Sequence, residues 1–321
     1  MSIRQGVRAG WRDRGMPSGD YMTQGKEIGF IGIGRMGAPM TKRLLDAGYA
    51  VTLFDKNTEA LKALEAAGAS IASSPRAIAD KVDTVLLSLP TPAIVEAVGR
   101  ELAEGKALRT VIDLSTTGPK GSEVLAGILA PAGIALVDAP VSGGVAGAAK
   151  GSLAIMAAGD PERLAETRAI LDCFGKVFIA GDKPGMGQTI KVINNLMSVT
   201  ALAIASEALV LGKASGLDPD RMIEIINASS GRTNATEDKI PRFVLPRTFD
   251  FGFALELSDK DTRLCVEHAD ALGMPMIVGS AVRQMLKIAM ATQGRQGDLT
   301  SIIRPIEDWM GVEVKGGGAK S

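Results

Sequence analysis

Three polar residues share one face of an otherwise apolar segment that runs from Gly185 to about Ser215. Lys191, Asn195 and Ser198 are spaced i, i+4 and i+7, so a helix would place them in line. The segment contains no proline, which predicts one long helix that is buried over most of its circumference. A buried amine is costly unless it has a partner or a chemical task, such as general acid–base catalysis. The spacing alone leaves a second interpretation open, in which the lysine only reaches from the helix to water.

A glycine-rich turn lies between a predicted strand and a predicted helix near the start of the chain. The apolar run at 26–31 predicts the strand, and residues 38–47 predict the helix, which Gly48 closes. A second strand is predicted at 50–54. This succession of strand, glycine turn, helix and strand is typical of dinucleotide-binding proteins.

The residues of this unit have separate physical tasks. Gly32 permits a tight turn, Gly34 lets the backbone approach a pyrophosphate, and Gly37 lets the helix pack close to the sheet. The free N–H groups at the start of the helix favour phosphate. Asp55, at the end of the second strand, can accept both hydroxyls of an adenosine ribose and repels a 2′-phosphate. We therefore expect NAD as the cofactor, with NADP as an alternative because Lys56 follows directly.

Two further buried strands are predicted at 82–89 and 110–114. Ligands of open parallel sheets bind where the strands end. We expect the residues at these two strand ends to line the cofactor; the alternative is that they form ordinary strand-to-helix loops. They are Leu89, Pro90, Ser115 and Thr116.

A second glycine-rich turn follows the predicted strand at 134–138. It contains Ser142, Gly143 and Gly144, whose backbone N–H groups suit a small carboxylate. Predicted strands near 153–157 and 176–179 complete this first part of the chain.

After Gly216 the pattern is helical throughout, with segments predicted at 220–228, 236–244, 257–272, 279–292 and 299–309. We therefore predict an α/β Rossmann-type N-terminal domain and an all-α C-terminal domain, joined by the long interdomain helix. The expected boundaries are a disordered extension at 1–25, a Rossmann domain at 26–184, the helix at 185–215, a helical domain at 216–312 and a tail at 313–321, in which Gly316-Gly-Gly is expected to be disordered.

Composition excludes several classes of function. The 36 basic and 36 acidic residues cancel and aromatic residues make up 4%, so we expect no nucleic-acid partner. No apolar run was expected to be long enough to span a membrane. Cys173 and Cys265 are far apart and in no metal-ligand spacing, which predicts no metal site and a reducing, cytoplasmic compartment. His268 is the only histidine, so serine–histidine hydrolysis and histidine–zinc chemistry are improbable.

Four motifs in order resemble the β-hydroxyacid dehydrogenase family, over nearly the whole range from 26 to 311. They are the fingerprint at 29–40, Asp138-Ala-Pro-Val-Ser-Gly-Gly, Gly187-Gln-Thr-Ile-Lys-Val-Ile-Asn-Asn, and Lys260-Asp261. The resemblance implies that Lys191 is the catalytic lysine and that Asn195 orients it and holds the substrate, with Asn194 and Ser198 beside it. It also implies a substrate-carboxylate loop at Ser142, Gly143 and Gly144. The implied cofactor contacts are Arg35, Met36, Asp55, Leu89, Thr116 and Lys260.

The implied reaction interconverts a small 3-hydroxy acid and its semialdehyde, of the 3-hydroxyisobutyrate or 2-hydroxy-3-oxopropionate type. Oxidation of a hydroxyl group needs a base and reduction needs an acid, and a buried lysine with a lowered pKa can serve as both. Relatives that act on sulfonates carry arginine where Gly143 stands, which favours a carboxylate here. Arg232, Lys239 and Arg242 are candidates for a further cation from the second domain.

Two alternatives remain at this stage. One is an imine reductase or another reductase on the same scaffold, and the other is a non-catalytic NAD-binding module. Family members of both kinds tend to lose the lysine, whereas this chain retains Lys191. The apolar interdomain helix and the resemblance favour a homodimer or homotetramer.

Overall fold

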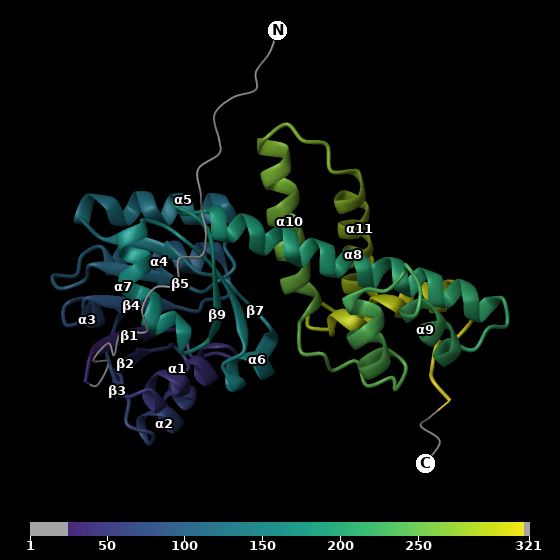
Figure 1. The fold of residues 1–321 in the computed structure, drawn as a ribbon, viewed down its shortest axis with the longest axis horizontal. Helices are drawn as coiled ribbons and strands as arrows, with labels where there is room; N and C mark the ends of the chain where they lie inside the picture. The colour runs from purple at the N-terminus through teal and green to yellow at the C-terminus, as the bar shows by residue number, and fades with distance from the viewer. Residues whose placement is uncertain (1–24, 318–321) are drawn as a thin grey trace, which may run out of the picture.

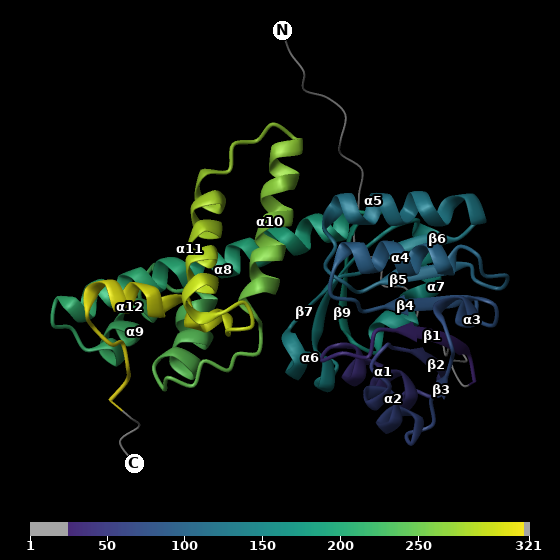
Figure 2. The same ribbon diagram turned by 180° about the vertical axis from the view of Figure 1, so that it is seen from behind.

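A nine-stranded sheet and a group of helices lie at opposite ends of one long helix, α8 (Met186–Ala214), as Figures 1 and 2 show from opposite sides. The computed structural model describes residues 25–317. The predicted extension therefore lies, except for Gly25, outside the described residues. The sheet domain and the helical domain correspond to the predicted Rossmann and all-α domains.

The sheet has the strand order β3-β2-β1-β4-β5-β6-β8-β7, and β9 pairs with β8. Strands β1 to β6 are parallel to one another, β8 runs antiparallel to β6 and β7, and β9 is parallel to β8. The strands are β1 (Glu27–Ile31), β2 (Ala50–Phe54), β3 (Ser70–Ile71), β4 (Thr84–Leu87), β5 (Thr110–Asp113), β6 (Ala135–Asp138), β7 (Val141–Ser142), β8 (Leu153–Ala158) and β9 (Gly175–Gly181).

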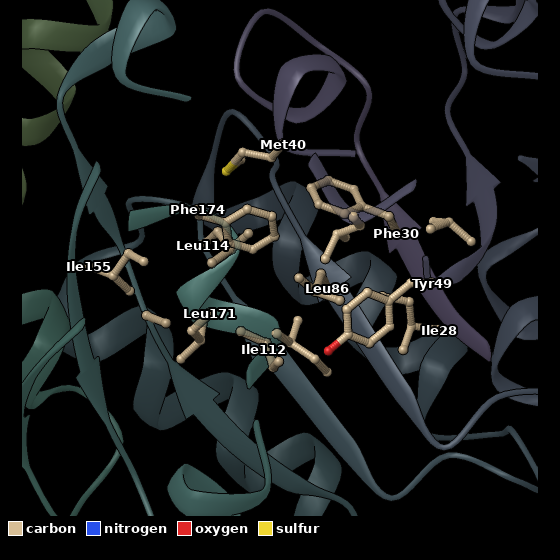
Figure 3. Packing of buried hydrophobic residues seen from close by; sticks show 14 of the residues in the cluster. Ile28, Phe30, Met40, Tyr49, Leu86, Ile112, Leu114, Ile155, Leu171 and Phe174 are labelled. Carbon is tan, nitrogen blue, oxygen red and sulfur yellow. The ribbon is translucent and has the colours of Figure 1, made fainter. Parts of the chain in front are cut away.

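Helices cover both faces of this sheet, which explains why the central strands read as continuous apolar runs. Neighbouring residues on a strand point to opposite faces. Phe30 packs with Leu86 and Phe174 in one core, shown in Figure 3, while Ile31 belongs to the core on the other face. The helices of this domain are α1 (Gly37–Asp46), α2 (Thr58–Glu65), α3 (Pro75–Ala79), α4 (Pro92–Leu102), α5 (Gly118–Leu129), η1 (Ala130–Ala132), α6 (Gly144–Lys150) and α7 (Pro161–Asp172).

The helical domain packs around the C-terminal half of α8. At 1.5 Å rise per residue, the 29 residues of α8 span roughly 44 Å, enough to reach through both domains. The other elements are α9 (Pro219–Asn227), the π-helix η2 (Ala235–Val244), α10 (Leu255–Ala271), α11 (Ile277–Gln293), η3 (Leu299–Ile303) and α12 (Arg304–Met310). Within the described part of this domain, the only β pairing is an isolated bridge between Ala254 and Asp298.

The segment from residue 313, predicted as a tail, packs against the helical domain as far as residue 317. Val314 is fully buried, and the N–H of Gly316 donates to the carbonyl of Leu245 at 3.0 Å. Residues 318–321 lie outside the described residues. In residues 25–317, α8 meets the length and hydropathy criteria for a membrane-spanning helix, contrary to expectation. Its packing against both domains accounts for the same composition.

Candidate active site

The glycine turn after β1 forms a cradle that is open on one side. Gly32 has φ +97°, and a Cβ there would lie 2.3 Å from the Ser88 carbonyl oxygen. A Cβ on Gly37 would lie 1.9 Å from the Gly32 carbonyl oxygen. At Gly34, in contrast, a Cβ would meet nothing within 4 Å. The first and third glycines are thus required by the fold, while the open side at Gly34 fits a dinucleotide pyrophosphate.

Asp55 lies directly beside this cradle because β1 and β2 are neighbours. Its carboxylate accepts hydrogen bonds from the backbone N–H groups of Ile33, at 2.5 Å, and Asn57, at 2.7 Å. These bonds fix the carboxylate and leave further lone pairs for ribose hydroxyls. Asp55 therefore fits the expected ribose site.

The predicted residues at the ends of β4 and β5 have different surroundings. Ser115 is buried, and its hydroxyl oxygen accepts the N–H of Leu89 at 2.9 Å, which ties the two strand ends together. Leu89 and Thr116 are half-buried, whereas Pro90 is exposed. The Ser115 side chain thus supports the loop from beneath, and Leu89 and Thr116 are better placed to line a ligand.

Two predicted cofactor contacts also join the domains. Arg35, which is exposed, donates to the carbonyl of Gly252 at 3.0 Å, and Lys260 donates to the carbonyl of Thr116 at 2.7 Å. Met36 is half-buried at the start of α1. The helical domain therefore closes onto the same loops that would hold the cofactor.

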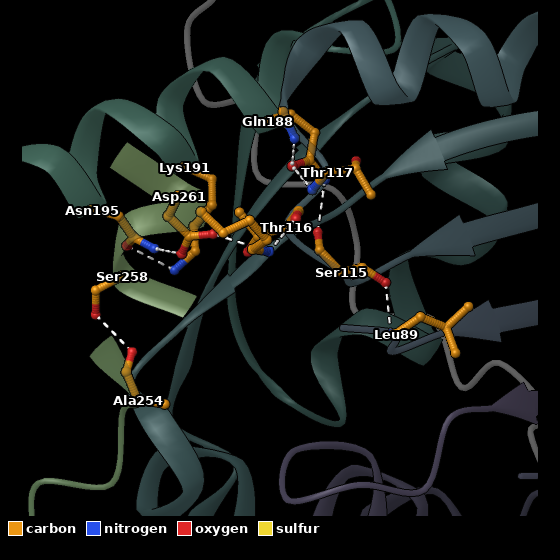
Figure 4. Close-up of polar contacts among 12 residues, drawn as sticks. Leu89, Ser115, Thr116, Thr117, Gln188, Lys191, Asn195, Ala254, Ser258 and Asp261 are labelled. Atoms are coloured by element: carbon orange, nitrogen blue, oxygen red, sulfur yellow. Dashed lines mark hydrogen bonds and ion pairs between the residues drawn. The ribbon is translucent and has the colours of Figure 1, made fainter. Parts of the chain in front are cut away.

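Lys191 is buried in the second turn of α8, with 7% of its surface exposed. Its Nζ donates to Asn195 Oδ1 at 3.0 Å, and Asn195 Nδ2 donates to Asp261 on α10 at 2.6 Å (Figure 4). The carboxylate of Asp261 also lies 3.0 Å from the Lys260 amine. A chain of polar contacts therefore runs from the end of β5 through α10 to the Lys191 amine.

The surroundings of Lys191 shift its pKa. Burial lowers the pKa of Lys191, the negative charge of Asp261 opposes that shift, and the positive charge of Lys260 adds to it. A lowered pKa makes the neutral amine more accessible than in an ordinary lysine, which suits a group that both accepts and donates a proton. Sequence reasoning treated Asp261 only as part of a motif and missed this role.

The other predicted residues of α8 differ in position. Asn194 is exposed, and its amide donates to Asn195 Oδ1 at 3.3 Å. The Ser198 hydroxyl oxygen accepts a hydrogen bond from the Lys239 amine at 3.0 Å. Ser198 therefore connects the face of α8 that carries Lys191 with η2 in the helical domain.

The start of α8 is anchored by residues that the sequence did not single out. The fully buried Gln188 accepts the N–H groups of Thr117 and Gly118, at 3.0 and 3.1 Å, and donates to the Ser115 carbonyl at 2.8 Å. The backbone N–H of Gln188 donates to Asp138 at 2.9 Å. The three side-chain contacts and the backbone contact of Gln188 could not be predicted from the sequence because each depends on the fold.

The predicted carboxylate loop lies on the side of the sheet that faces the helical domain, where β7 and β9 appear in Figures 1 and 2. Gly143 and Gly144 have φ angles of +132° and +66°, and both are exposed. Ser142 is half-buried and pairs with Ala154 of β8. The loop follows Asp138 closely, and Asp138 contacts the start of α8, so the loop and the first turn of α8 both adjoin the end of β6. Among the described residues, no cluster of three or more metal-ligating side chains is present.

A dinucleotide cradle and a buried, hydrogen-bonded lysine at the domain junction are features of an NAD(P)-dependent oxidoreductase. Comparison with known proteins agrees. Residues 27–181 match the model for the NAD-binding domain of 6-phosphogluconate dehydrogenase, and residues 185–306 match the model described as NAD-binding of NADP-dependent 3-hydroxyisobutyrate dehydrogenase.

The chain is 36% identical to 2-(hydroxymethyl)glutarate dehydrogenase of Eubacterium barkeri over 301 residues, which cover 92% of this chain and 100% of that protein. It is 34% identical to the NAD-dependent L-serine dehydrogenase of Pseudomonas aeruginosa, with 88% and 98% covered. The solved structure of Mycobacterium tuberculosis 3-hydroxyisobutyrate dehydrogenase with L-serine has a TM-score of 0.80 and 30% identity, with 88% and 99% covered.

The chain belongs to the β-hydroxyacid dehydrogenase family, and it is an NAD(P)-dependent dehydrogenase of small hydroxy acids. Solved imine reductases, such as that of Streptomyces aurantiacus at 21% identity and a TM-score of 0.56, share only the fold. This distance disfavours the imine reductase alternative.

Proposed function

We propose that Lys191 is the general acid and base for the reversible oxidation of a small 3-hydroxy acid to its semialdehyde. The observation that carries this proposal is the buried Lys191 amine, oriented by Asn195, which Asp261 holds in turn. Bound NAD(P) supplies the hydride acceptor for oxidation and the hydride donor for reduction. The protein supplies position and proton transfer.

In the oxidising direction, neutral Lys191 accepts the hydroxyl proton of the substrate as the C–H bond breaks. In the reducing direction, the Lys191 ammonium donates that proton to the carbonyl oxygen and stabilises its developing negative charge. The Asn195 side-chain oxygen accepts one N–H of the Lys191 amine and so directs it. The backbone N–H groups at Gly143 and Gly144, with the Ser142 hydroxyl, would bind the substrate carboxylate.

Cofactor preference and assembly belong to the same proposal. Asp55 favours NAD over NADP because its carboxylate would repel a 2′-phosphate.

A second copy of the chain would cover the apolar face of α8, whose exposed side chains include Ile193, Met197, Ile204 and Leu211. A cytoplasmic location is supported by the two unpaired cysteines. Either 3-hydroxyisobutyrate or 2-hydroxy-3-oxopropionate chemistry fits this site.

The test measures NADH formation with 3-hydroxyisobutyrate, glycerate, L-serine and 2-(hydroxymethyl)glutarate. Lys191→Met should lower kcat/KM at least about 1000-fold, because it removes the proton acceptor and leaves the volume similar. Lys213→Met, an exposed lysine in the last turn of α8, is the matched control and should behave as wild type. In the wild type the oxidation rate should rise with pH through the lowered pKa of Lys191. Unchanged turnover in Lys191→Met would refute the mechanism.

A further inference from the structure

Lys239 is a second buried lysine, on η2 where it packs against α8, and the mechanism above does not use it. Only 3% of its surface is exposed. Its Nζ donates to the Ser198 hydroxyl at 3.0 Å and to the Asn234 side-chain oxygen, and it lies 5.3 Å from the centre of the Phe251 ring. All three of these contacts are with neutral groups. Burying an ammonium group without a bonded anion is costly. Burial lowers the pKa of Lys239, and the negative charge of Asp238 opposes that shift.

No ion pair among residues 25–317 includes Lys239. The adjacent carboxylate of Asp238 lies 2.7 Å from Arg242 instead. An ammonium group has three N–H donors, and Ser198 and Asn234 occupy two of them. One N–H donor of the Lys239 ammonium therefore remains for a ligand, and no carboxylate in the described part of the chain is bonded to it.

The position of Lys239 relative to Lys191 follows from the geometry of α8. The Lys191 amine is bonded to Asn195, and the Lys239 amine is bonded to Ser198, three residues further along the same helix face. Three residues correspond to about 4.5 Å of rise. The helix positions to which the two amines are bonded are thus about one turn apart on one face, a spacing that a substrate of five or six carbon atoms can bridge.

The charges along this face of α8 favour an anionic ligand. Lys191 and Lys239 each bond to this face, and Lys260 lies beside Asp261, which holds Asn195. Two carboxylates act on these three amines: Asp261, which contacts Lys260 and Asn195, and Asp238, whose charge acts on Lys239. Lys239 also belongs to a π-helix, an element found often at functional sites because its wider turn costs stability. A lysine with a purely structural role would be expected to reach water with its amine.

We propose that Lys239, with Ser198, forms a subsite for a second carboxylate, so that the enzyme favours 3-hydroxy acids with two carboxylates. The proposal rests on the proposed function and assigns the substrate class of the same site. The first carboxylate binds the Ser142–Gly144 loop, the hydroxyl group meets Lys191, and the distal carboxylate accepts a hydrogen bond from the Lys239 ammonium.

The experiment compares 2-(hydroxymethyl)glutarate, a dianion, with 3-hydroxyisobutyrate, a monoanion, as substrates of the enzyme with NAD. Wild type should have the higher kcat/KM with the dianion. Lys239→Met should lower the ratio of the two kcat/KM values about 10- to 100-fold, chiefly through KM of the dianion, as expected for the loss of a charge-assisted hydrogen bond. Lys213→Met should leave the ratio unchanged, and Lys239→Arg should retain most of the preference.

A second measurement separates this proposal from the proposed function. Calorimetry with the enzyme–NADH complex measures the binding of glutarate and of butyrate, neither of which can react. Glutarate should bind more tightly than butyrate, and Lys239→Met should remove the difference. If neither hydroxy acid is oxidised, the proposed function fails. The difference in binding between glutarate and butyrate still shows whether Lys239 binds a second carboxylate.

Two results would overturn the subsite. They are an equal kcat/KM for the two acids in wild type, and an unchanged ratio in Lys239→Met. Thermal melting shows whether the variant is folded. Lys239→Gln, which retains a donor and removes only the charge, replaces the methionine variant if that one does not fold.

Discussion

Replacement of Asp138 by asparagine should change how the stability of the protein depends on pH. Asp138 is fully buried at the end of β6 and lies beside Asp113 of β5 in the parallel register. One of its oxygens accepts the N–H of Gln188, and the other has no hydrogen-bond partner among the described residues. Burial raises the pKa of Asp138 to about 7, hydrogen bonds from the start of α8 oppose the shift, and the charge of Asp113 adds to it.

The sign follows from proton binding. The unfolded chain releases this proton near pH 3.8 and the folded chain near pH 7, so between these values the folded state holds more protons. The free energy of unfolding therefore falls as pH rises through this window. With these two pKa values, Asp138 alone lowers the free energy of unfolding by about 3 kcal/mol between pH 5 and pH 8. Asparagine has no proton to lose, so the loss should be absent.

The assay is urea unfolding, followed by circular dichroism at pH 5 and pH 8. Between pH 5 and pH 8, the free energy of unfolding of Asp138→Asn should rise by roughly 2 to 3 kcal/mol relative to that of wild type. Asp270→Asn, an exposed aspartate on α10, is the control and should follow wild type. Equal pH dependence in wild type and Asp138→Asn would refute the reasoning about the buried carboxyl group.

Three further predictions test the site and its assembly. Asp261→Asn removes the negative charge that raises the pKa of Lys191, so the pH profile of kcat/KM for oxidation should shift to lower pH by roughly one unit; a profile at the wild-type position would contradict the assigned coupling. Asp55→Ala should weaken the preference for NAD over NADP about 10-fold or more, measured as the ratio of kcat/KM for the two cofactors; tighter binding of NADP by the wild type would show the preference to be misassigned. Met197→Glu places a charge on the exposed apolar face of α8 and should reduce the mass in solution measured by light scattering, whereas a monomeric wild type would refute the homo-oligomer.

Much of the fold could be predicted because its signals are local. The glycine spacing at Gly32, Gly34 and Gly37 depends only on backbone conformation within one turn. The central strands β1, β4 and β5 are almost entirely buried, and most of their residues are therefore apolar. The length of α8 followed from the absence of proline and from the apolar run. The packed tail was missed because Val314 becomes buried through contacts with distant segments, which glycine-rich composition does not indicate.

The partners of the site could be predicted less well. Lys191, Asn195 and Ser198 share a face by helical spacing, and the structure keeps them there. The residues that complete the site come from other elements. Asp261 on α10 and Lys239 on η2 reach α8 only once the helical domain is folded, so neither spacing nor composition could show which group faces which amine.

The anchoring of α8 has a consequence for the order of events in one catalytic cycle. The first turn of α8 is bonded to the ends of β5 and β6 through Gln188, whereas Asn195 and the Thr116 carbonyl are held by α10. If α10 moved away to release a product, the Asn195–Asp261 and Lys260–Thr116 bonds would break while those of Gln188 stayed. The Lys191 backbone would keep its place over the sheet, but its amine would lose its orientation. Product release would then interrupt proton transfer. Closure would restore it by reorienting the Lys191 amine alone, because the backbone of Lys191 would not have moved.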